Sequence, residues 1–201
     1  MISSRFRNYH VVLASKSPRR QQLLEGMNIS FTTLLKEVDE SYPAMLPVGE
    51  ISGYLSKKKA MAFTIDELPE SFLLITADTI VVIDNEVLNK PLDRNEAIRM
   101  LTRLSGNHHK VITGVSIRDE QSMVTFSEES DVKFVNLTPE EIEYYVDEYQ
   151  PFDKAGSYGI QEWIGYIAIE SVNGSFFNVM GLPTHRLYLE MMNFVNRGVI
   201  I

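Results

Sequence analysis

A group of serine and arginine side chains follows an apolar stretch near the start of the chain. Residues 11–14 read Val-Val-Leu-Ala, which predicts a buried strand, and Ser-Pro at 17–18 is typical of a helix start. Ser15, Lys16, Arg19 and Arg20 surround that helix start, where unpaired backbone N–H groups also attract anions. Because basic side chains oppose the helix dipole here, their presence indicates a phosphate-like anion site. The alternative is an ordinary turn with solvated arginines.

One carboxylate interrupts the most apolar stretch of the chain. Residues 72–77 and 80–83 are rich in Leu, Ile, Val and Phe, which predicts two buried strand segments with Asp78 between them. A buried carboxylate is costly unless it is paired or holds a metal ion. Asp78 is therefore the strongest catalytic candidate on physical grounds.

Three more charged side chains are candidates for the same chemistry. Glu40 belongs to an acidic loop, which is either simply solvated or holds a hard cation together with phosphate oxygens. Lys59 falls on the apolar face of a predicted helix at 49–63, where its ammonium either reaches the protein edge or extends to a phosphate. Lys90 follows a predicted hairpin, so we expect it to lie near Asp78. The alternative is that Lys90 is a loop lysine that only forms a salt bridge.

Two glycines bracket an aromatic residue ahead of Gln161, in the sequence Gly-Ser-Tyr-Gly-Ile-Gln at 156–161. Glycine allows a backbone to approach a ligand closely, and a glutamine amide both donates and accepts hydrogen bonds. The pattern is neither a P-loop nor a dinucleotide fingerprint. His108 and His109 have no metal-ligand spacing, so we expect both to be surface residues of a loop.

Alternating helices and strands must position these side chains. Ser-Pro, Asp-Arg-Asn-Glu and Thr-Pro-Glu-Glu predict helix starts at about residues 18, 94 and 139. Lys57 and Lys58 of the second predicted helix are expected to be solvated. The predicted helices span Pro18–Gly26, 49–63, 94–105, 139–150 and a segment after 181–183, and the predicted strands span 29–35, 72–77, 80–83, 87–88, 110–118, 123–135, 165–172 and 176–179.

The composition indicates one globular domain spanning residues 1–201. The formal net charge of −8 disfavours non-specific binding to nucleic acid or to an anionic membrane. The absence of cysteine excludes disulfides, thiolate metal sites and cysteine nucleophiles. No apolar run is long enough for a membrane span or a signal peptide, so we expect a cytoplasmic protein without a membrane partner.

Several separate motifs together resemble the Maf family of nucleoside triphosphate pyrophosphatases. The resemblance covers nearly the whole chain, and its specificity comes from the number of motifs and their order. The motifs are Leu-Ala-Ser-Lys-Ser-Pro-Arg-Arg at 13–20, Ala-Asp-Thr at 77–79, Lys-Pro at 90–91, Leu-Ser-Gly at 104–106, Thr-Gly at 113–114, Asp-Lys-Ala-Gly at 153–156, Tyr-Gly-Ile-Gln at 158–161, Asn-Gly-Ser at 173–175 and Gly-Leu-Pro at 181–183.

The resemblance implies an α/β fold, with an elongated mixed β-sheet, flanking helices and two lobes around a cleft, related to the inosine triphosphate pyrophosphatases. It implies hydrolysis of a nucleoside triphosphate between the α and β phosphates, with Mg²⁺ or Mn²⁺ as cofactor, and it suggests a homodimer. Carried over by position, Ser15, Arg19 and Arg20 would contact the triphosphate, and Glu40, Lys59, Asp78, Lys90 and Gln161 would line the active site.

The two carboxylates would share the metal and proton chemistry. Asp78 and Glu40 would hold the cation, and Asp78 would act as base towards the attacking water. Which carboxylate binds the metal and which takes the proton stays open at this point.

The family also divides by substrate. The dTTP/UTP branch has arginine after Ser-Pro, threonine after the catalytic aspartate and glutamine after Gly-Ile, and here these are Arg19, Thr79 and Gln161. A neutral amide suits the O4 and N3–H edge of a pyrimidine. The alternatives are the 7-methyl-GTP branch, which has tryptophan, glutamine and glutamate there, and a septum-formation protein that inhibits cell division through protein interaction.

Trp163, in a stretch that is commonly glycine-rich, either stacks on a base or covers the core.

Overall fold

The computed structural model describes residues 6–196, and these form two compact units. Unit 1 comprises the residues up to Asp78, Thr113–Glu128 and the residues from Gly181 onward, and unit 2 comprises Thr79–Ile112 and Glu129–Met180. No helix within 6–196 has both the length and the apolar character needed to cross a membrane.

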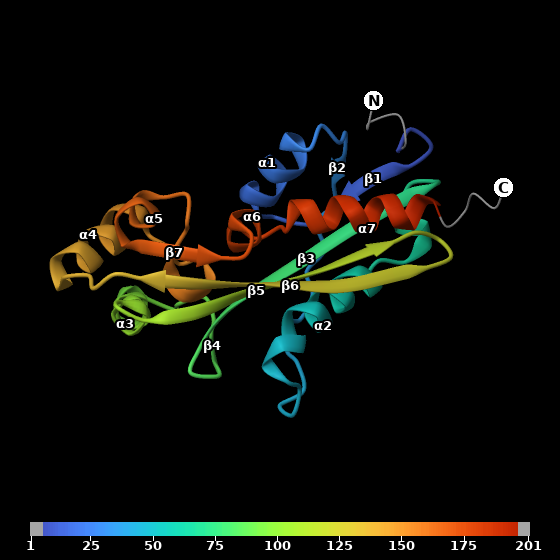
Figure 1. Cartoon of the computed structure of the whole chain (residues 1–201). Helices are drawn as coiled ribbons and strands as arrows, with labels where there is room; N and C mark the ends of the chain where they lie inside the picture. The colour runs from blue at the N-terminus through green and yellow to red at the C-terminus, as the bar shows by residue number, and fades with distance from the viewer. Residues whose placement is uncertain (1–5, 197–201) are drawn as a thin grey trace. The chain divides into compact units, whose positions relative to one another are not determined.

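The fold is mixed α/β, as expected (Figure 1). Among the described residues, seven strands form one mixed sheet in the order β2-β1-β3-β5-β6-β7, with β4 paired to β3. The strands are β1 (His10–Leu13), β2 (Thr32–Thr33), β3 (Phe72–Ile83), β4 (Glu86–Leu88), β5 (His108–Arg118), β6 (Met123–Phe134) and β7 (Ile169–Asn173). The helices are α1 (Pro18–Gly26), α2 (Val48–Met61), α3 (Arg94–Leu104), α4 (Pro139–Tyr149), α5 (Trp163–Ala168), α6 (Phe176–Met180) and α7 (Thr184–Asn196), with 3-10 turns η2 (Ile65–Glu67) and η3 (Ala155–Ser157).

In unit 1, β1 pairs in parallel with both β2 and β3. Buried parallel strands read as continuous apolar runs, which explains the composition of β1 and β3. Leu13 is in register with Ile75, so Ser15 and Asp78 both lie beyond this last pair, Ser15 after the end of β1 and Asp78 in the middle of β3. Ligands of open α/β sheets bind outside the carboxyl ends of strands, so the register places both candidates near the carboxyl end of β1, where a site is expected.

Helix α2 lies against the sheet of unit 1 at backbone contact distance. A Cβ on Gly114 of β5 would lie 2.2 Å from the carbonyl carbon of Ser52, so only glycine fits there. The Thr76 hydroxyl of β3 donates to the carbonyl oxygen of Ser56 at 2.7 Å. These contacts hold the helix that carries Lys59.

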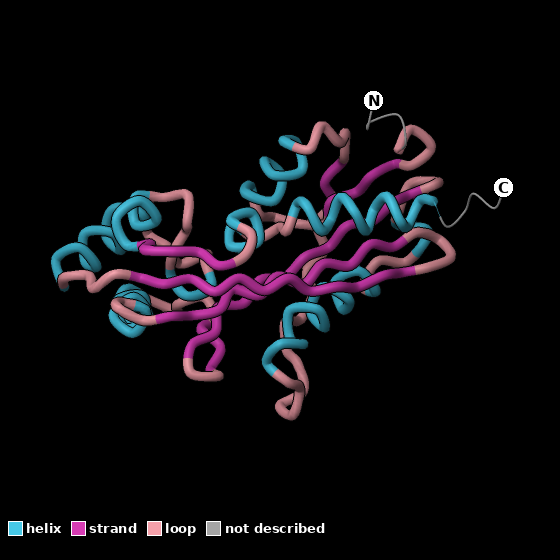
Figure 2. The backbone as a smooth tube through the Cα atoms, in the orientation of Figure 1, coloured by secondary structure: helices cyan, strands magenta, loops and turns pink. Residues whose placement is uncertain are grey.

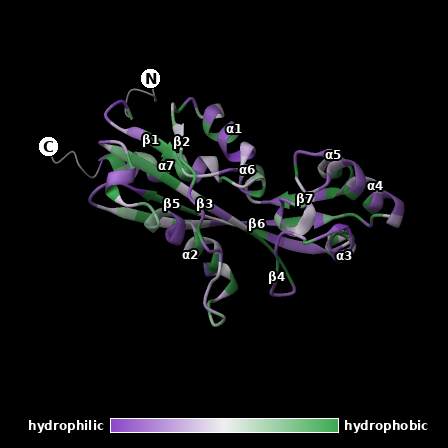
Figure 3. Ribbon diagram, turned by 180° about the vertical axis from the view of Figure 1, so that it is seen from behind, coloured by the Kyte–Doolittle hydropathy of each residue, from purple (hydrophilic) through white to green (hydrophobic). Residues whose placement is uncertain are grey.

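In unit 2, α3 packs against α4 and against η3. Arg94 of α3 donates from Nε and Nη2 to the two carboxylate oxygens of Asp147 at 2.6 and 2.9 Å. Figure 3 shows hydrophilic and hydrophobic residues alternating along α4, whose buried residues are Ile142, Tyr145 and Val146. The buried stripe has helical spacing, so α4 presents one apolar face to the unit.

Most predicted helices are confirmed. Helix α1 has the predicted bounds, and α4 begins with the predicted capping box between Thr138 and Glu141. The Asp84-Asn85 turn has positive φ at both residues, 51° and 61°, as a tight hairpin between β3 and β4 requires. The strand β3 is continuous through Asp78 rather than interrupted by it.

Three strand predictions are wrong in extent or type (Figure 2). The segment predicted as a strand at 165–172 is helix α5 followed by β7, and the predicted return strand at 176–179 lies in helix α6. Ile164 and Ala168 are four residues apart and both buried, so a helical period outweighed the apparent alternation. The strand predicted at 29–35 is reduced to Thr32–Thr33.

The prediction that both neighbouring histidines are surface loop residues is wrong for His109. Both belong to β5, where successive side chains face opposite ways. His108 is exposed and lies 2.7 Å from Asp131, whereas His109 is 2% exposed and its Nε2 lies 2.8 Å from the Tyr158 hydroxyl. Burial lowers the pKa of His109 to about 4, so its ring is neutral near pH 7.

Candidate active site

The turn between β1 and α1 forms one part of the candidate site. Ser15 is buried, and its Oγ accepts a hydrogen bond from the Ser17 backbone N–H at 3.2 Å. Ser17 occupies the cap position in extended conformation, but its side chain makes no capping hydrogen bond, and the first turn of α1 holds no acidic residue. The helix start therefore keeps the positive end of its dipole without a negative side chain of its own, as an anion site requires.

Arg20 joins three segments of unit 1. Its Nε donates to the carbonyl oxygen of Gly181 and its Nη1 to that of Ala77, both at 2.8 Å, and Nη1 lies 3.5 Å from Ser15 Oγ. Burial lowers the pKa of Arg20, while the nearby negative charge of Asp78 opposes that shift. Arg20 thus stabilises the turn through its hydrogen bonds to two backbone carbonyl oxygens, and it also places a positive charge there.

Lys59 lies between the two candidate carboxylates. Its Nζ is 2.5 Å from Asp78 Oδ1 and 2.7 Å from Glu40 Oε1. The Asp78 side chain is 11% exposed and that of Lys59 18%, whereas Glu40 comes from a loop and is 48% exposed. The ammonium is therefore held between two carboxylates and is mostly buried.

The loop that carries Glu40 is held by the neighbouring lysine. Lys58 Nζ donates to Asp39 Oδ2 and to the Ser41 carbonyl oxygen, both at 2.9 Å, and the Ser41 N–H donates to Asp39 Oδ1 at 3.0 Å. The Ser41 hydroxyl and then Lys58 lower the pKa of Asp39 to about 2. The expectation that Lys58 is merely solvated is wrong, because its contacts fix both neighbours of Glu40.

The donor set of this cluster fits a divalent metal ion. Within residues 6–196 no group of three or more His, Cys, Asp or Glu side chains is placed to hold a metal ion. Mg²⁺, however, typically takes only one or two carboxylates and completes its octahedral shell with water and substrate phosphates. Asp78 and Glu40 already converge on one cation, the Lys59 ammonium, so the pair suits a metal ion that is shared with a phosphate.

The other three predicted site residues belong to unit 2. Thr79 directly follows Asp78 in β3 and is half-buried, and Lys90 is an exposed residue after β4. Gln161 lies just before α5, and its Oε1 is buried with no hydrogen-bond partner among the described residues. A buried acceptor without a partner is costly, so it indicates a position where a ligand donates.

A buried network beside Gln161 escaped the sequence analysis. The Tyr145 hydroxyl donates to Glu162 Oε2, and Lys154 Nζ lies 3.2 Å from Glu162 Oε1. Tyr145 and Lys154 are 0% and 7% exposed. The sequence contained a signal for these residues, because Glu162 directly follows Gln161 and Lys154 belongs to the Asp-Lys-Ala-Gly motif. The contacts themselves could not be predicted, because they form only when the separate segments that carry Tyr145, Lys154 and Glu162 come together in the fold.

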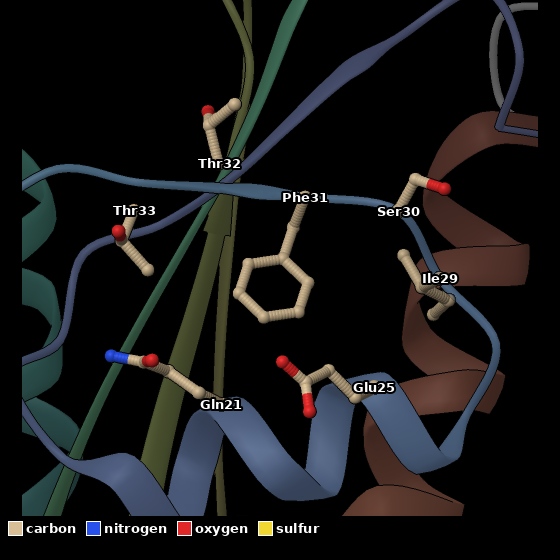
Figure 4. A pocket seen from close by; sticks show the side chains of 7 residues that line it. All are labelled: Gln21, Glu25, Ile29, Ser30, Phe31, Thr32 and Thr33. Atoms are coloured by element: carbon tan, nitrogen blue, oxygen red, sulfur yellow. The ribbon is translucent and has the colours of Figure 1, made fainter.

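A separate hollow in unit 1 lies between α1 and β2 (Figure 4). Figure 4 shows Gln21 and Glu25 of α1 beside the ring of Phe31, and none of the predicted site residues lines this hollow. Its only charged side chain is the carboxylate of Glu25, which repels phosphate. This hollow is therefore no candidate for the anion site.

Comparisons with known proteins agree with this geometry. The family model described as Maf-like protein matches residues 10–194. The chain is 51% identical over 190 residues to a dTTP/UTP pyrophosphatase of Porphyromonas gingivalis, covering 94% of this chain and 96% of the relative. It is 51% identical over 184 residues to a protein of the same name from Bacteroides thetaiotaomicron, covering 91% of this chain and 95% of the relative.

A more distant relative extends the comparison. The chain is 46% identical over 193 residues to a dTTP/UTP pyrophosphatase of Flavobacterium psychrophilum, covering 96% of this chain and 98% of the relative. The family match spans residues of both units and every candidate site residue. The chain belongs to the family of Maf-like proteins.

Proposed function

We propose that the protein hydrolyses dTTP and UTP to the nucleoside monophosphate and pyrophosphate. The observation that carries the proposal is the Lys59 ammonium held between the Glu40 carboxylate and the carboxylate of Asp78 in the buried strand β3. A binding module has no need of this costly arrangement, whereas phosphoryl transfer uses both kinds of charge. The substrate follows from relatives of about 50% identity that are named dTTP/UTP pyrophosphatases.

The triphosphate would bind at the start of α1. The N–H groups of the first turn and the Arg19 side chain would supply positive charge there, and Ser15 lies at the same turn. Arg20 holds this turn through its contacts with the Gly181 and Ala77 carbonyl oxygens, and it contributes its charge to the same region. Lys90 would offset the charge that develops on the leaving pyrophosphate.

The reaction is attack of water on the α-phosphorus. A new bond forms between the water oxygen and phosphorus, and the bond from phosphorus to the bridging oxygen breaks, releasing pyrophosphate. Asp78 would accept the proton of the water. Lys59 keeps the Asp78 carboxylate oriented and supplies positive charge beside it.

A divalent cation, Mg²⁺ or Mn²⁺, would be held by Asp78 and Glu40. When bound, it would neutralise phosphate oxygens and so favour a nucleophilic attack on them. Lys59 would share its two carboxylate partners with the cation, and the half-exposed loop position of Glu40 suits that sharing.

The base would be read by Gln161 and Thr79. The unpartnered Oε1 of Gln161 accepts from the N3–H of uracil or thymine, and the amide nitrogen donates to O4. A cationic 7-methylguanine would instead favour a carboxylate at this position.

We also propose that both units act as one catalytic domain and that the protein is a cytoplasmic homodimer. Its net charge of −8 would disfavour binding to nucleic acid.

Pyrophosphate release tests the proposal. The assay would compare dTTP, UTP and 7-methyl-GTP with Mg²⁺ and with Mn²⁺, for the natural protein and for Asp78→Asn. We expect release from dTTP and UTP and a loss of about a thousandfold in kcat for Asp78→Asn. Folded protein that releases no pyrophosphate from any of the three would refute the enzyme, and preference for 7-methyl-GTP would refute the substrate.

A further inference from the structure

A glutamine amide can present two opposite hydrogen-bonding patterns to a pyrimidine. With Oε1 at N3 and Nε2 at the 4-position, it matches the N3–H and O4 of uracil or thymine. After half a turn about its last side-chain bond, it matches the N3 acceptor and the 4-amino group of cytosine. Gln161 therefore separates uracil from cytosine only if another group fixes that rotation.

The Glu162 carboxylate and the NH₂ group of this amide both lie close to the same point beside Gly159. Gln161 Nε2 and Glu162 Oε1 are 3.0 and 3.1 Å from the point that a Cβ on Gly159 would occupy, so both approach the same small space. An ionised carboxylate only accepts hydrogen bonds. It attracts the NH₂ end of the amide and repels the oxygen end, which favours the rotation that matches uracil and thymine.

Glu162 is itself held firmly. The fully buried Tyr145 hydroxyl donates to Glu162 Oε2 and accepts from the Gly159 N–H at 3.1 Å. The buried Lys154 ammonium, 3.2 Å from Glu162 Oε1, supplies the opposite charge. The network therefore fixes the carboxylate and the backbone on which Gln161 sits.

The oxygen end of Gln161 supports the same rotation. Oε1 is buried and has no hydrogen-bond partner among residues 6–196. Oε1 is a hydrogen-bond acceptor, so a ligand satisfies it only by offering a donor. The N3–H of uracil or thymine is such a donor, whereas N3 of cytosine is an acceptor.

We propose that Glu162, held by Tyr145 and Lys154, is a positioning residue that fixes the amide rotation of Gln161 and thereby makes the site select uracil and thymine over cytosine. This inference rests on the proposed function, because it assumes that Gln161 reads the base. Glu162 acts only through Gln161 and does not touch the reacting phosphates.

The ratio of kcat/KM for UTP to that for CTP tests the proposal. We expect the natural protein to prefer UTP by about tenfold or more, and Glu162→Gln to reduce that ratio by about tenfold, because a second amide no longer dictates the rotation. Tyr145→Phe should reduce it in the same direction. Glu148→Gln and Tyr144→Phe, exposed neighbours on α4, serve as controls that leave the ratio unchanged.

A double substitution distinguishes a positioning role of Glu162 from a general disruption of the structure. In Gln161→Ala protein, adding Glu162→Gln should leave the UTP to CTP ratio unchanged, because the group through which it acts is gone. Equal loss on both nucleotides, a further change in the Gln161→Ala background, or a natural protein that does not discriminate would each overturn the inference. If the natural protein does not hydrolyse UTP, the proposed function itself is overturned. UTP hydrolysis by the natural protein is therefore measured before that of any variant.

Discussion

The candidate residues of the two units differ in their charge and surroundings. In unit 1, Asp78, Lys59 and Glu40 form short charge pairs, and one of the three comes from a half-exposed loop. In unit 2, Gln161 is a neutral amide next to Glu162, whose carboxylate is held by the buried Tyr145 and Lys154 side chains. Under the proposed function, the charged groups would exchange partners when a metal ion and the triphosphate bind, whereas base recognition would require groups that stay in place.

This difference separates the expected effects of substitution. Changes in the charged cluster should lower the rate for every nucleotide, since all share the same phosphates. Changes in the buried network should alter the choice among nucleotides. The predictions below run from the largest expected effect to the smallest, and each can break or sharpen this contrast.

Lys59→Met tests whether the cluster acts on all substrates alike. The methionine keeps most of the buried stem but removes the charge between Asp78 and Glu40. We expect kcat to fall by several hundredfold, roughly 3 to 4 kcal/mol, equally for dTTP and UTP. Lys57→Met, an exposed neighbour on α2, is the control and should be near the natural rate. A loss confined to one nucleotide would contradict the division of roles between the units.

Gly114→Ala tests how far the cluster depends on the backbone packing of α2. The new methyl group would lie 2.2 Å from the Ser52 carbonyl carbon, so either α2 or β5 must move. We expect unfolding free energy to fall by about 3 kcal/mol, measured by urea denaturation. Gly49→Ala, at a position in α2 with nothing within 4 Å of the new methyl, should be neutral or slightly stabilising. Equal stability of the two variants would show that the close contact is unimportant.

Acid should weaken the fold through His109 in unit 2. The pKa of His109 is lowered to about 4 by burial, whereas an unfolded histidine titrates near 6.5. Between these values the unfolded chain binds the extra proton, so stability is unaffected above about pH 6.5 and falls as the pH drops below it. The opposing attraction of Asp131 and the repulsion of His108 are smaller than the burial effect.

The size of this effect can be measured by urea denaturation at pH 7 and pH 5. We expect His109 to account for a loss of about 2 kcal/mol between these pH values. His109→Gln, which has no proton to bind, should lose correspondingly less over the same interval. A variant with the same acid sensitivity as the natural protein would show that His109 is not the responsible group.

Lys58→Met should give the smallest kinetic effect. It removes the contacts with Asp39 and the Ser41 carbonyl that fix the loop around Glu40, but it leaves every candidate catalytic group in place. We expect kcat/KM to fall by about tenfold, with a higher requirement for Mg²⁺, since Glu40 is less well positioned. High salt should weaken the exposed Lys58 contacts in the natural protein and move it in the same direction. An unchanged Mg²⁺ requirement would mean that the loop holds Glu40 without Lys58.

Much of the site could be predicted from local sequence. Asp78 stood out because a carboxylate in an apolar run needs a partner, and that partner is Lys59. The helix start at Pro18 followed from Ser-Pro. The roles of Lys58 and Glu162 could not be predicted, because each depends on a segment more than a dozen residues away in the chain.

The sequence by itself determined the elements whose signals are local: the bounds of α1, the Asp84-Asn85 hairpin and the capping box of α4. Caps and turns act within four residues, so neighbouring side chains are sufficient to specify them. Only the tertiary structure decided that residues 163–168 are helical, that His109 is buried while His108 is exposed, and that Lys58 pairs with Asp39 in the loop of Glu40. In each case the local pattern allowed two conformations or two partners, and the choice came from which arrangement buries apolar surface and pairs every buried charge.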